Sequence, residues 1–338
     1  MSPTPQTQSL LDALCRRGVI CVTTVRYWRG CKKLRAEDLG LSSDQIDDRL
    51  FQLGQKRLVP REALSRFALL ESRVNAAVES ASFPFLNGMG RFVPATNIES
   101  LHRDLQALAS EFQEAAAAFH ARYPILREEA MGEWEKAAAR LPHTHAARLL
   151  ATIREAFPPA EAVHRKFGFQ HHMLQIAIPE QLETRLLDHE TSLFQQRERQ
   201  RILDEAADTL QSELDTFVRQ SVITLRAETV QLIDEVLATI DARGEGVHQR
   251  TLNRLTDFIQ RVRRLNFAGD RELETHLDQF RAELLTRSAG DYREDADAFQ
   301  RLTGGLHRLR DQARDLLESD PSHLLEDFAQ LGHRRLAC

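Results

Sequence analysis

The sequence predicts a mainly α fold, with a small α+β head at the N-terminus followed by a long helical coiled-coil hairpin or bundle. No proline lies between Glu180 and Asp320, and no glycine lies between Gly168 and Gly244. Because residues 180–243 contain neither proline nor glycine, this segment is expected to form one helix of roughly 95 Å. The composition agrees, because 28% charged and 7% aromatic residues are typical of long amphipathic helices, while 42% hydrophobic residues suffice for a packed core.

The head is expected to span residues 10–178, after a disordered tail at 1–9 that contains Pro3 and Pro5. Its strongest strand signal is the β-branched run VICVTTV at 19–25. We expect the neighbouring elements to be a short helix at 10–16, a short helix capped by Ser42 or Ser43 and ending near 53, a short strand at 56–59, and a helix from Pro60 to about Ser80.

A short β-hairpin is expected at 83–94, where the sequence reads FPFLNGMGRFVP. Asn87, Gly88 and Gly90 tolerate the positive φ angles of a tight turn, and they lie between two apolar arms. We name residues 85–92 the hairpin tip and treat it as a candidate docking surface for a partner protein. Its members are Phe85, Leu86, Asn87, Gly88, Met89, Gly90, Arg91 and Phe92.

Prolines punctuate the rest of the head. We expect a helix from Ile98 to about Arg122, a second from Pro124 to about Arg140, and a third at 143–157. Pro158 and Pro159 form the clearest break in the chain. The run FQHHMLQIAI at 169–178 is then expected to return as a strand to the N-terminal sheet.

The helical region at 180–320 carries a coiled-coil seam, in which apolar residues alternate three and four positions apart, with a register shift near Phe217. Return helices are expected at 247–265 and 271–287, and a short helix and tail at 321–338. The sequence leaves open whether the seam pairs within one chain or between copies in a homo-oligomer. The principal seam residues are Leu203, Leu210, Leu214, Phe217, Val222, Leu225, Leu232, Val236, Leu302, Leu306 and Leu309.

Several functional classes are disfavoured by the sequence. The formal net charge of -5 provides no global field for nucleic acid or an anionic membrane, and the N-terminus has no signal-peptide pattern. We therefore expect a cytoplasmic protein with reduced cysteines. Phosphate-loop, zinc-helix and nucleophile-elbow motifs are missing from the sequence, so we expect no enzyme, no cofactor and no metal.

Two histidine pairs have the wrong spacing for a complete metal site, and we interpret them as surface or capping residues. They are His143 with His145, and His171 with His172.

A basic stretch at 16–35 is the most suggestive functional signal. It contains no acidic residue, and aromatic rings lie at its centre, so it could hold phosphate and stack on bases. The alternative is that Tyr27 and Trp28 fill the core while the cations are solvated or pair with Glu37 and Asp38. The candidate binding residues are Arg26, Tyr27, Trp28, Arg29, Lys32, Lys33 and Arg35.

Three strings in the first ~130 residues carry a family resemblance. They are YWRGCKKLRAEDLGL at 27–41, KRLVP at 56–60 and FPFLNGMGRFVP at 83–94. The chain resembles an uncharacterised bacterial and phage domain-of-unknown-function family, whose gene often lies near a MoxR-type AAA ATPase and a von Willebrand factor A protein. The resemblance implies a partner in an ATPase-driven assembly and no particular reaction.

Together these observations favour a non-enzymatic adaptor or scaffold within a multi-protein assembly. A nucleic-acid-binding component, acting through the basic stretch, is the first alternative. The second is a membrane-active long-helix protein whose hairpin tip inserts into a bilayer.

Overall fold

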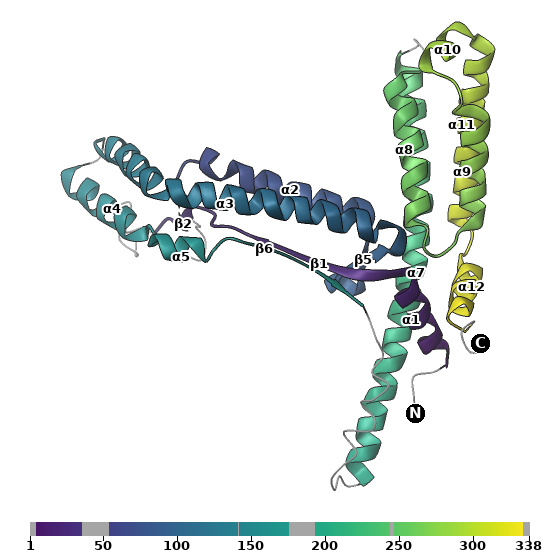
Figure 1. The fold of residues 1–338 in the computed structure, drawn as a ribbon, viewed down its shortest axis with the longest axis horizontal. Helices are drawn as coiled ribbons and strands as arrows, with labels where there is room; N and C mark the ends of the chain where they lie inside the picture. Colours follow the sequence, from purple (N-terminus) through teal and green to yellow (C-terminus); the bar gives the residue numbers. More distant parts are fainter. Residues whose placement is uncertain (1–4, 36–53, 141, 176–192, 244–246, 334–338) are drawn as a thin grey trace. The chain divides into compact units, whose positions relative to one another are not determined.

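The computed structural model describes residues 5–35, 54–140, 142–175, 193–243 and 247–333 (Figure 1). Helices dominate these ranges and a small antiparallel sheet accompanies them, so the predicted mainly α fold class is confirmed. The chain forms two compact units, each built from separate stretches. We name them the bundle unit, comprising 1–22, 78–101 and 172–338, and the aromatic unit, comprising 23–77 and 102–171.

The sheet confirms the strands that the β-branched and apolar runs predict. Its strand order is β4-β5-β1-β6, and β5 pairs antiparallel with both β4 and β1. Gly18 begins β1 where a Cβ atom would collide with the backbone oxygen of Val93, so only glycine fits this pairing. The strands are β1 (Gly18–Arg26), β4 (Phe83–Phe85), β5 (Gly90–Pro94) and β6 (Gly168–Leu174).

The long helix predicted from the absence of proline and glycine is α7, which is described from Leu193 to Arg243. The expected start at Glu180 and the expected helix at 42–53 both lie outside the described residues. A further helix appears at 289–294, where Ser288 and Asp291 form a capping box at its start, and the expected 271–287 helix ends at Leu284. The helices after α7 are α8 (Gln249–Leu265), α9 (Arg271–Leu284), α10 (Ala289–Glu294), α11 (Ala296–Glu318) and α12 (Ser322–His333).

Ion pairs define how α7 and α11 run. Arg219 on α7 pairs with Asp320 just beyond α11, whereas Asp234, further along α7, pairs with Arg314 at 2.8 Å. The numbering therefore rises on one helix as it falls on the other, so the two helices are antiparallel. In the described part of the chain, the predicted seam is thus buried within one chain.

The N-terminal helix α1 (Pro5–Arg17) begins earlier than the sequence suggests. Residues 5–9 belong to this helix rather than to a disordered tail. Proline is well tolerated in a first helical turn, where its missing N–H is not needed. The apolar face of α1 packs in the same core as α12, with Leu14 and Phe328 both fully buried, and this packing stabilises a helix that is short for independent stability.

Phenylalanine rings tie the β4–β5 hairpin to the helices of the bundle unit. The ring of Phe85 lies 4.9 Å from that of Phe217 on α7, and the ring of Phe92 lies 4.7 Å from that of Phe267. Such edge-to-face and tilted contacts add to the stabilisation from burial. The hairpin is therefore part of the core at its base.

The aromatic unit contains residues of two long helices, α2 (Glu62–Ala81) and α3 (Ala95–Ala138). The prediction that a helix ends near Arg122 is wrong, because α3 continues through Pro124. Phe119, Tyr123 and Leu126 are buried at helical spacing on both sides of the proline, and this packing outweighs the loss of one backbone hydrogen bond.

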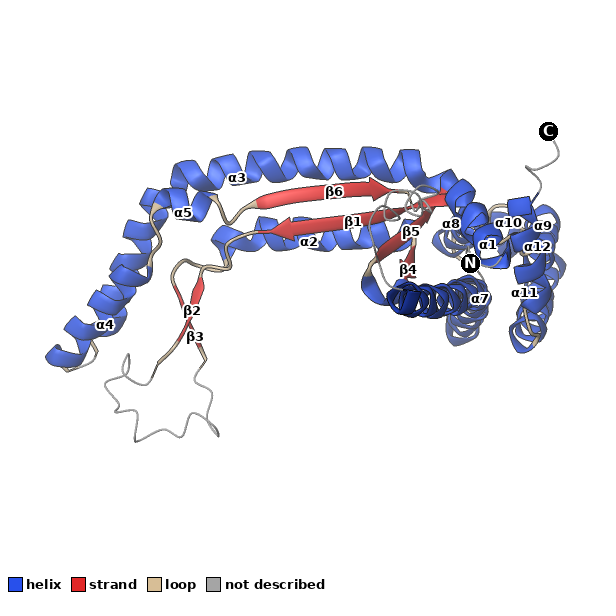
Figure 2. Cartoon of the chain, turned by 90° about the horizontal axis from the view of Figure 1, so that it is seen from below, coloured by secondary structure: helices blue, strands red, loops and turns tan. Residues whose placement is uncertain are grey.

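Smaller elements complete the aromatic unit. The helices α4 (His143–Ala156) and α5 (Ala160–His164) are separated by Phe157, Pro158 and Pro159, as expected from the two prolines. The strands β2 (Cys31–Lys33) and β3 (Gln55–Arg57) form a separate antiparallel ribbon (Figure 2). The second of these lies close to the short strand predicted at 56–59.

Candidate interaction surfaces

The hairpin tip is a tightly constrained loop rather than an open tip. Leu86 has a φ of 37°, which is rare for a side chain other than glycine, and Gly88 has a φ of 96°. Phe85 and Phe92 are core residues, and Leu86 packs against the same core. Met89 is 72% exposed, whereas the side chain of Asn87 lies outside the described residues. The surface that this loop offers a partner is therefore centred on Met89.

Arg91 anchors the hairpin instead of offering a free charge. Its Nε donates to Ser82 Oγ at 2.8 Å, and a second guanidinium nitrogen donates to the Ser82 carbonyl at 3.2 Å. Burial lowers the pKa of the Arg91 guanidinium. At the base of the loop, Gly90 lies so close to Ile20 that a Cβ atom would come within 2.6 Å of its side chain.

A groove of about 500 Å³ lies between this hairpin and α7. Pro84 and Leu86 form part of one wall, and polar side chains of α7 form the other. This groove was not predicted from the sequence. The available signal was the run of polar residues four apart on a long helix, which places Ser212, Thr216, Gln220 and Thr224 on one face.

The aromatic residues of the basic stretch belong to the core of the aromatic unit. Trp28 is 4% exposed and packs edge-on against Tyr123, with ring centroids 5.6 Å apart. Tyr27 stacks on Phe67 at 5.6 Å and carries the Arg29 guanidinium 4.0 Å from its ring centre. The interpretation of Trp28 as a core residue is confirmed, and neither ring is free to stack on a base.

Arg29 is held by the carboxylate of Glu71, which was not predicted as its partner. Its guanidinium donates to both oxygens of Glu71 on α2, at 2.9 and 3.1 Å, and this hydrogen bonding lowers the pKa of the Glu71 carboxyl. The anticipated acidic neighbours, Glu37 and Asp38, lie outside the described residues. Arg29 is thus a structural cation.

We name the remaining exposed cations Arg26, Lys32, Lys33 and Arg35 the basic ribbon. Lys32 and Lys33 are exposed on β2 and pair in register with Lys56 and Gln55. Arg35 is exposed just beyond β2, and Arg26 is exposed at the end of β1. Arg16 and Arg17 lie at the end of α1 in the bundle unit, so the basic stretch is divided between the two units.

The predicted seam residues occupy the interior of the helical bundle. Leu210 is partly buried and packs against this core, while Leu203 lies in α7 with its side chain outside the described residues. The other members are all buried: Leu214, Phe217, Val222, Leu225, Leu232, Val236, Leu302, Leu306 and Leu309. Their role is to hold the bundle together.

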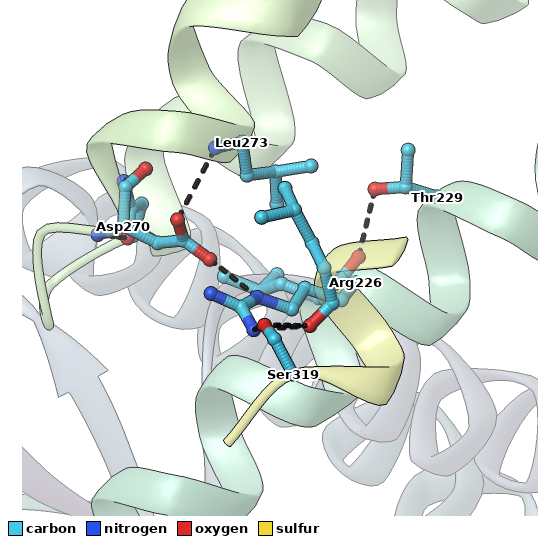
Figure 3. Close-up of polar contacts among 8 residues, drawn as sticks. Arg226, Thr229, Asp270, Leu273 and Ser319 are labelled. Carbon is cyan, nitrogen blue, oxygen red and sulfur yellow. Dashed lines mark hydrogen bonds and ion pairs between the residues drawn. The ribbon is translucent and has the colours of Figure 1, made fainter. Parts of the chain in front are cut away.

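A buried ion pair inside the bundle was not predicted (Figure 3). Arg226 of α7 donates from Nε to Asp270 at 2.7 Å, and its Nη1 donates to the carbonyl of Leu316 and to Ser319. Asp270 also caps α9 by accepting from the Leu273 N–H at 3.1 Å. One guanidinium therefore joins α7, the start of α9 and the end of α11.

A stacked histidine pair borders a cavity of about 420 Å³ in the aromatic unit. The rings of His120 on α3 and His164 on α5 lie 4.3 Å apart, and His120 Nε2 is buried without a hydrogen-bond partner. Burial, and then the charge of His164, lower the pKa of His120. Among the described residues, no three His, Cys, Asp or Glu side chains gather where they could hold a metal ion.

A comparison with protein families shows which family the chain belongs to. A family model described as a protein of unknown function, DUF3150, matches residues 16–311. The chain belongs to the DUF3150 family. The match reaches far beyond the ~130 residues that carry the motif resemblance and includes α7 to α10 and most of α11.

Searches of the curated proteins and of the solved structures give no significant match to the DUF3150 chain. In the described part of the chain, no helix combines the length and apolar character needed to span a bilayer.

Proposed function

We propose that this DUF3150 protein is a non-enzymatic adaptor or scaffold that docks a partner protein through the loop around Met89. The observation that carries the proposal is the 72% exposure of Met89 on a loop whose base is locked into the core. A large apolar side chain on a constrained loop can be buried by a partner at little cost in ordering entropy. Methionine is well suited to this role, because its flexible thioether adapts to different partner surfaces.

Two contacts and one backbone conformation hold the loop in place. Phe85 packs on Phe217, Arg91 holds Ser82, and the backbone at Leu86 adopts a positive φ. A non-glycine residue in this conformation costs of order 1–3 kcal/mol, and such strain concentrates at ligand clamps and switch regions. The hairpin thus combines an exposed apolar side chain with a strained, well-supported backbone.

The family resemblance supplies the partners to test. We propose that the protein works in the cytoplasm with a MoxR-type AAA ATPase and a von Willebrand factor A protein. The antiparallel bundle supports a scaffolding role, because the described part of its seam is buried inside the chain while Met89 remains exposed to a second protein.

The test is affinity capture from the native cell followed by mass spectrometry, with the wild type compared with Met89→Asp. We expect this substitution to abolish capture of the partner without changing the fold, because Met89 contributes little to the core. The matched control is Leu69→Asp on α2, where the side chain is 59% exposed. Equal capture by the wild type and Met89→Asp would refute docking at this loop.

Nucleic-acid binding through the basic ribbon is the second candidate. It is favoured by the exposure of Lys32 and Lys33, which are consecutive residues on β2. Because Tyr27 and Trp28 are packed internally, such binding would rest on phosphate contacts and would weaken steeply with salt. Retention of single-stranded DNA or RNA at low salt should then disappear in Lys32→Glu/Lys33→Glu and persist in the charge-matched Arg165→Glu/Lys166→Glu.

A further inference from the structure

We propose that the groove between the β4–β5 hairpin and α7 binds a cationic segment of the partner, a lysine or arginine flanked by an apolar residue. This inference rests on the proposed docking function and names the chemistry of its ligand. It follows from the groove's lining, which offers hydrogen-bond acceptors and one negative charge beside an apolar surface.

Three of the four hydroxyl groups on the α7 wall have already used their donor hydrogens. Thr216 donates to the Ser212 carbonyl at 2.7 Å, Ser221 to the Phe217 carbonyl at 2.8 Å, and Thr224 to the Gln220 carbonyl at 2.8 Å. A hydroxyl has one hydrogen to donate but two lone pairs. The three side chains can therefore serve a ligand only as acceptors.

The edge of the hairpin wall also lacks a hydrogen-bond donor at its centre. β4 is the terminal strand in the order β4-β5-β1-β6, and Pro84 lies at its centre. Proline has a carbonyl acceptor and no N–H donor, which suits an edge position. A bound segment therefore finds no backbone N–H donor at Pro84.

Glu213 fixes the sign of the ligand's charge. It is the single charged residue among those that line the groove, and it lies on the α7 wall one turn before Phe217. A cationic group would meet this carboxylate together with the hydroxyl acceptors, whereas an anionic group would be repelled by the carboxylate.

The remaining lining explains the apolar part of the ligand. Phe83 and Phe217 contribute ring surface, and Leu86 lies at the edge of the same groove. Met89 projects from the loop that carries Leu86 and Gly88, so an apolar neighbour of the cation can contact it. A segment bound here would thus use the Met89 surface of the proposed docking site and the acceptor wall together.

The experiment is a fluorescence anisotropy titration of the full chain with three labelled peptides of about twelve residues. One alternates leucine with lysine, one leucine with glutamate and one leucine with glutamine. We expect the lysine peptide to bind and the other two to bind at least about tenfold more weakly. Glu213→Gln should weaken binding of the lysine peptide about tenfold, in line with hydrogen bonds to a charged group.

A charge-matched control separates this site from general attraction to an acidic protein. Glu114→Gln removes one exposed carboxylate from α3 and should change the affinity less than about twofold. Thr216→Val/Thr224→Val keeps the shape of the α7 wall while removing two acceptors, and it should also weaken binding of the lysine peptide.

Two outcomes would overturn the inference. One is equal binding of the lysine and glutamine peptides. The other is an equal response to Glu213→Gln and Glu114→Gln. In either case, loss of partner capture in Met89→Asp would still support the docking function, so the two proposals fail separately.

Discussion

At the scale of single residues, the buried Arg226–Asp270 pair has the largest expected effect on stability. Both side chains are almost completely buried, at 1% and 2% exposure. Removing one partner of such a pair leaves an uncompensated charge and costs about 3–5 kcal/mol. We therefore expect Arg226→Met to lower the free energy of unfolding by about that amount in urea denaturation followed by circular dichroism.

The double variant Arg226→Met/Asp270→Asn distinguishes charge burial from lost packing. Asparagine caps a helix about as well as aspartate, so the start of α9 should be kept. We expect the double variant to be more stable than Arg226→Met alone. Arg219→Met, which breaks an exposed pair on the same helix, should cost less than about 1 kcal/mol. Additive losses in the double variant would contradict this account.

His120 provides a pH-dependent prediction. Burial and the nearby charge of His164 lower its pKa in the folded protein from the ordinary value of 6.5. Below about pH 6.5 this histidine therefore takes up a proton more readily in the unfolded chain than in the folded protein. The free energy of unfolding should consequently fall as the pH falls.

Denaturant titrations between about pH 5 and 8 measure this slope. His120→Gln should flatten this slope. An unchanged slope in His120→Gln would contradict the assignment.

At the scale of elements, the strands and helices that were predicted correctly are those whose sequence signals lie within the segment itself. The β-branched run gave β1, the Asn-Gly pair gave the β4–β5 hairpin, and the absence of proline and glycine gave the described part of α7. Pro124 misled the prediction because burial of Phe119 and Tyr123 on one face keeps α3 continuous. That burial is a tertiary effect and cannot be read from the proline alone.

The two glycines inside α11 show why this helix can pack as it does. A Cβ atom on Gly305 would collide with the Leu284 side chain of α9, whereas on Gly304 it would meet only Arg308, at 3.9 Å. Alanine in a helix interior is favoured over glycine by roughly 0.5–1 kcal/mol. We expect Gly304→Ala to stabilise the protein by about that amount in chemical denaturation.

Gly305→Ala tests the close approach of α9 and α11. The same gain in helix propensity is opposed by overpacking, which typically costs about 1–3 kcal/mol. Gly305→Ala should therefore be less stable than Gly304→Ala. Equal stabilisation by both substitutions would show that α9 can move away from α11 without loss.

At the scale of the whole molecule, the sequence predicted which residues line the buried seam. It did not predict whether the helices that pair through this seam belong to one chain or to two. The seam from Leu214 to Val236 was recognisable from its spacing, and either an intramolecular or an intermolecular partner would satisfy it. Polar contacts made by residues outside the seam show which of the two pairings the protein uses. Asp234 with Arg314, and Arg226 with the carbonyl of Leu316, fix α11 of the same chain as the partner.

The candidate surfaces were also only partly predictable from local sequence patterns. The hairpin tip and the cations of the basic ribbon were visible as local patterns, but burial of Trp28, Phe85 and Phe92 depends on packing partners far away in sequence. The groove beside α7 needs two elements more than a hundred residues apart, so it could not be predicted.

In-chain burial of the seam predicts the mass of the protein in solution. Size-exclusion chromatography with light scattering should give a monomer of 38.6 kDa over a wide concentration range, because the described seam leaves no apolar stripe for a second copy. Leu306→Asp places a charge in the fully buried seam of α11 and should open the bundle. The exposed α7 stripe would then drive self-association, while Leu69→Asp should remain monomeric. A wild-type dimer that persists on dilution would contradict pairing within one chain.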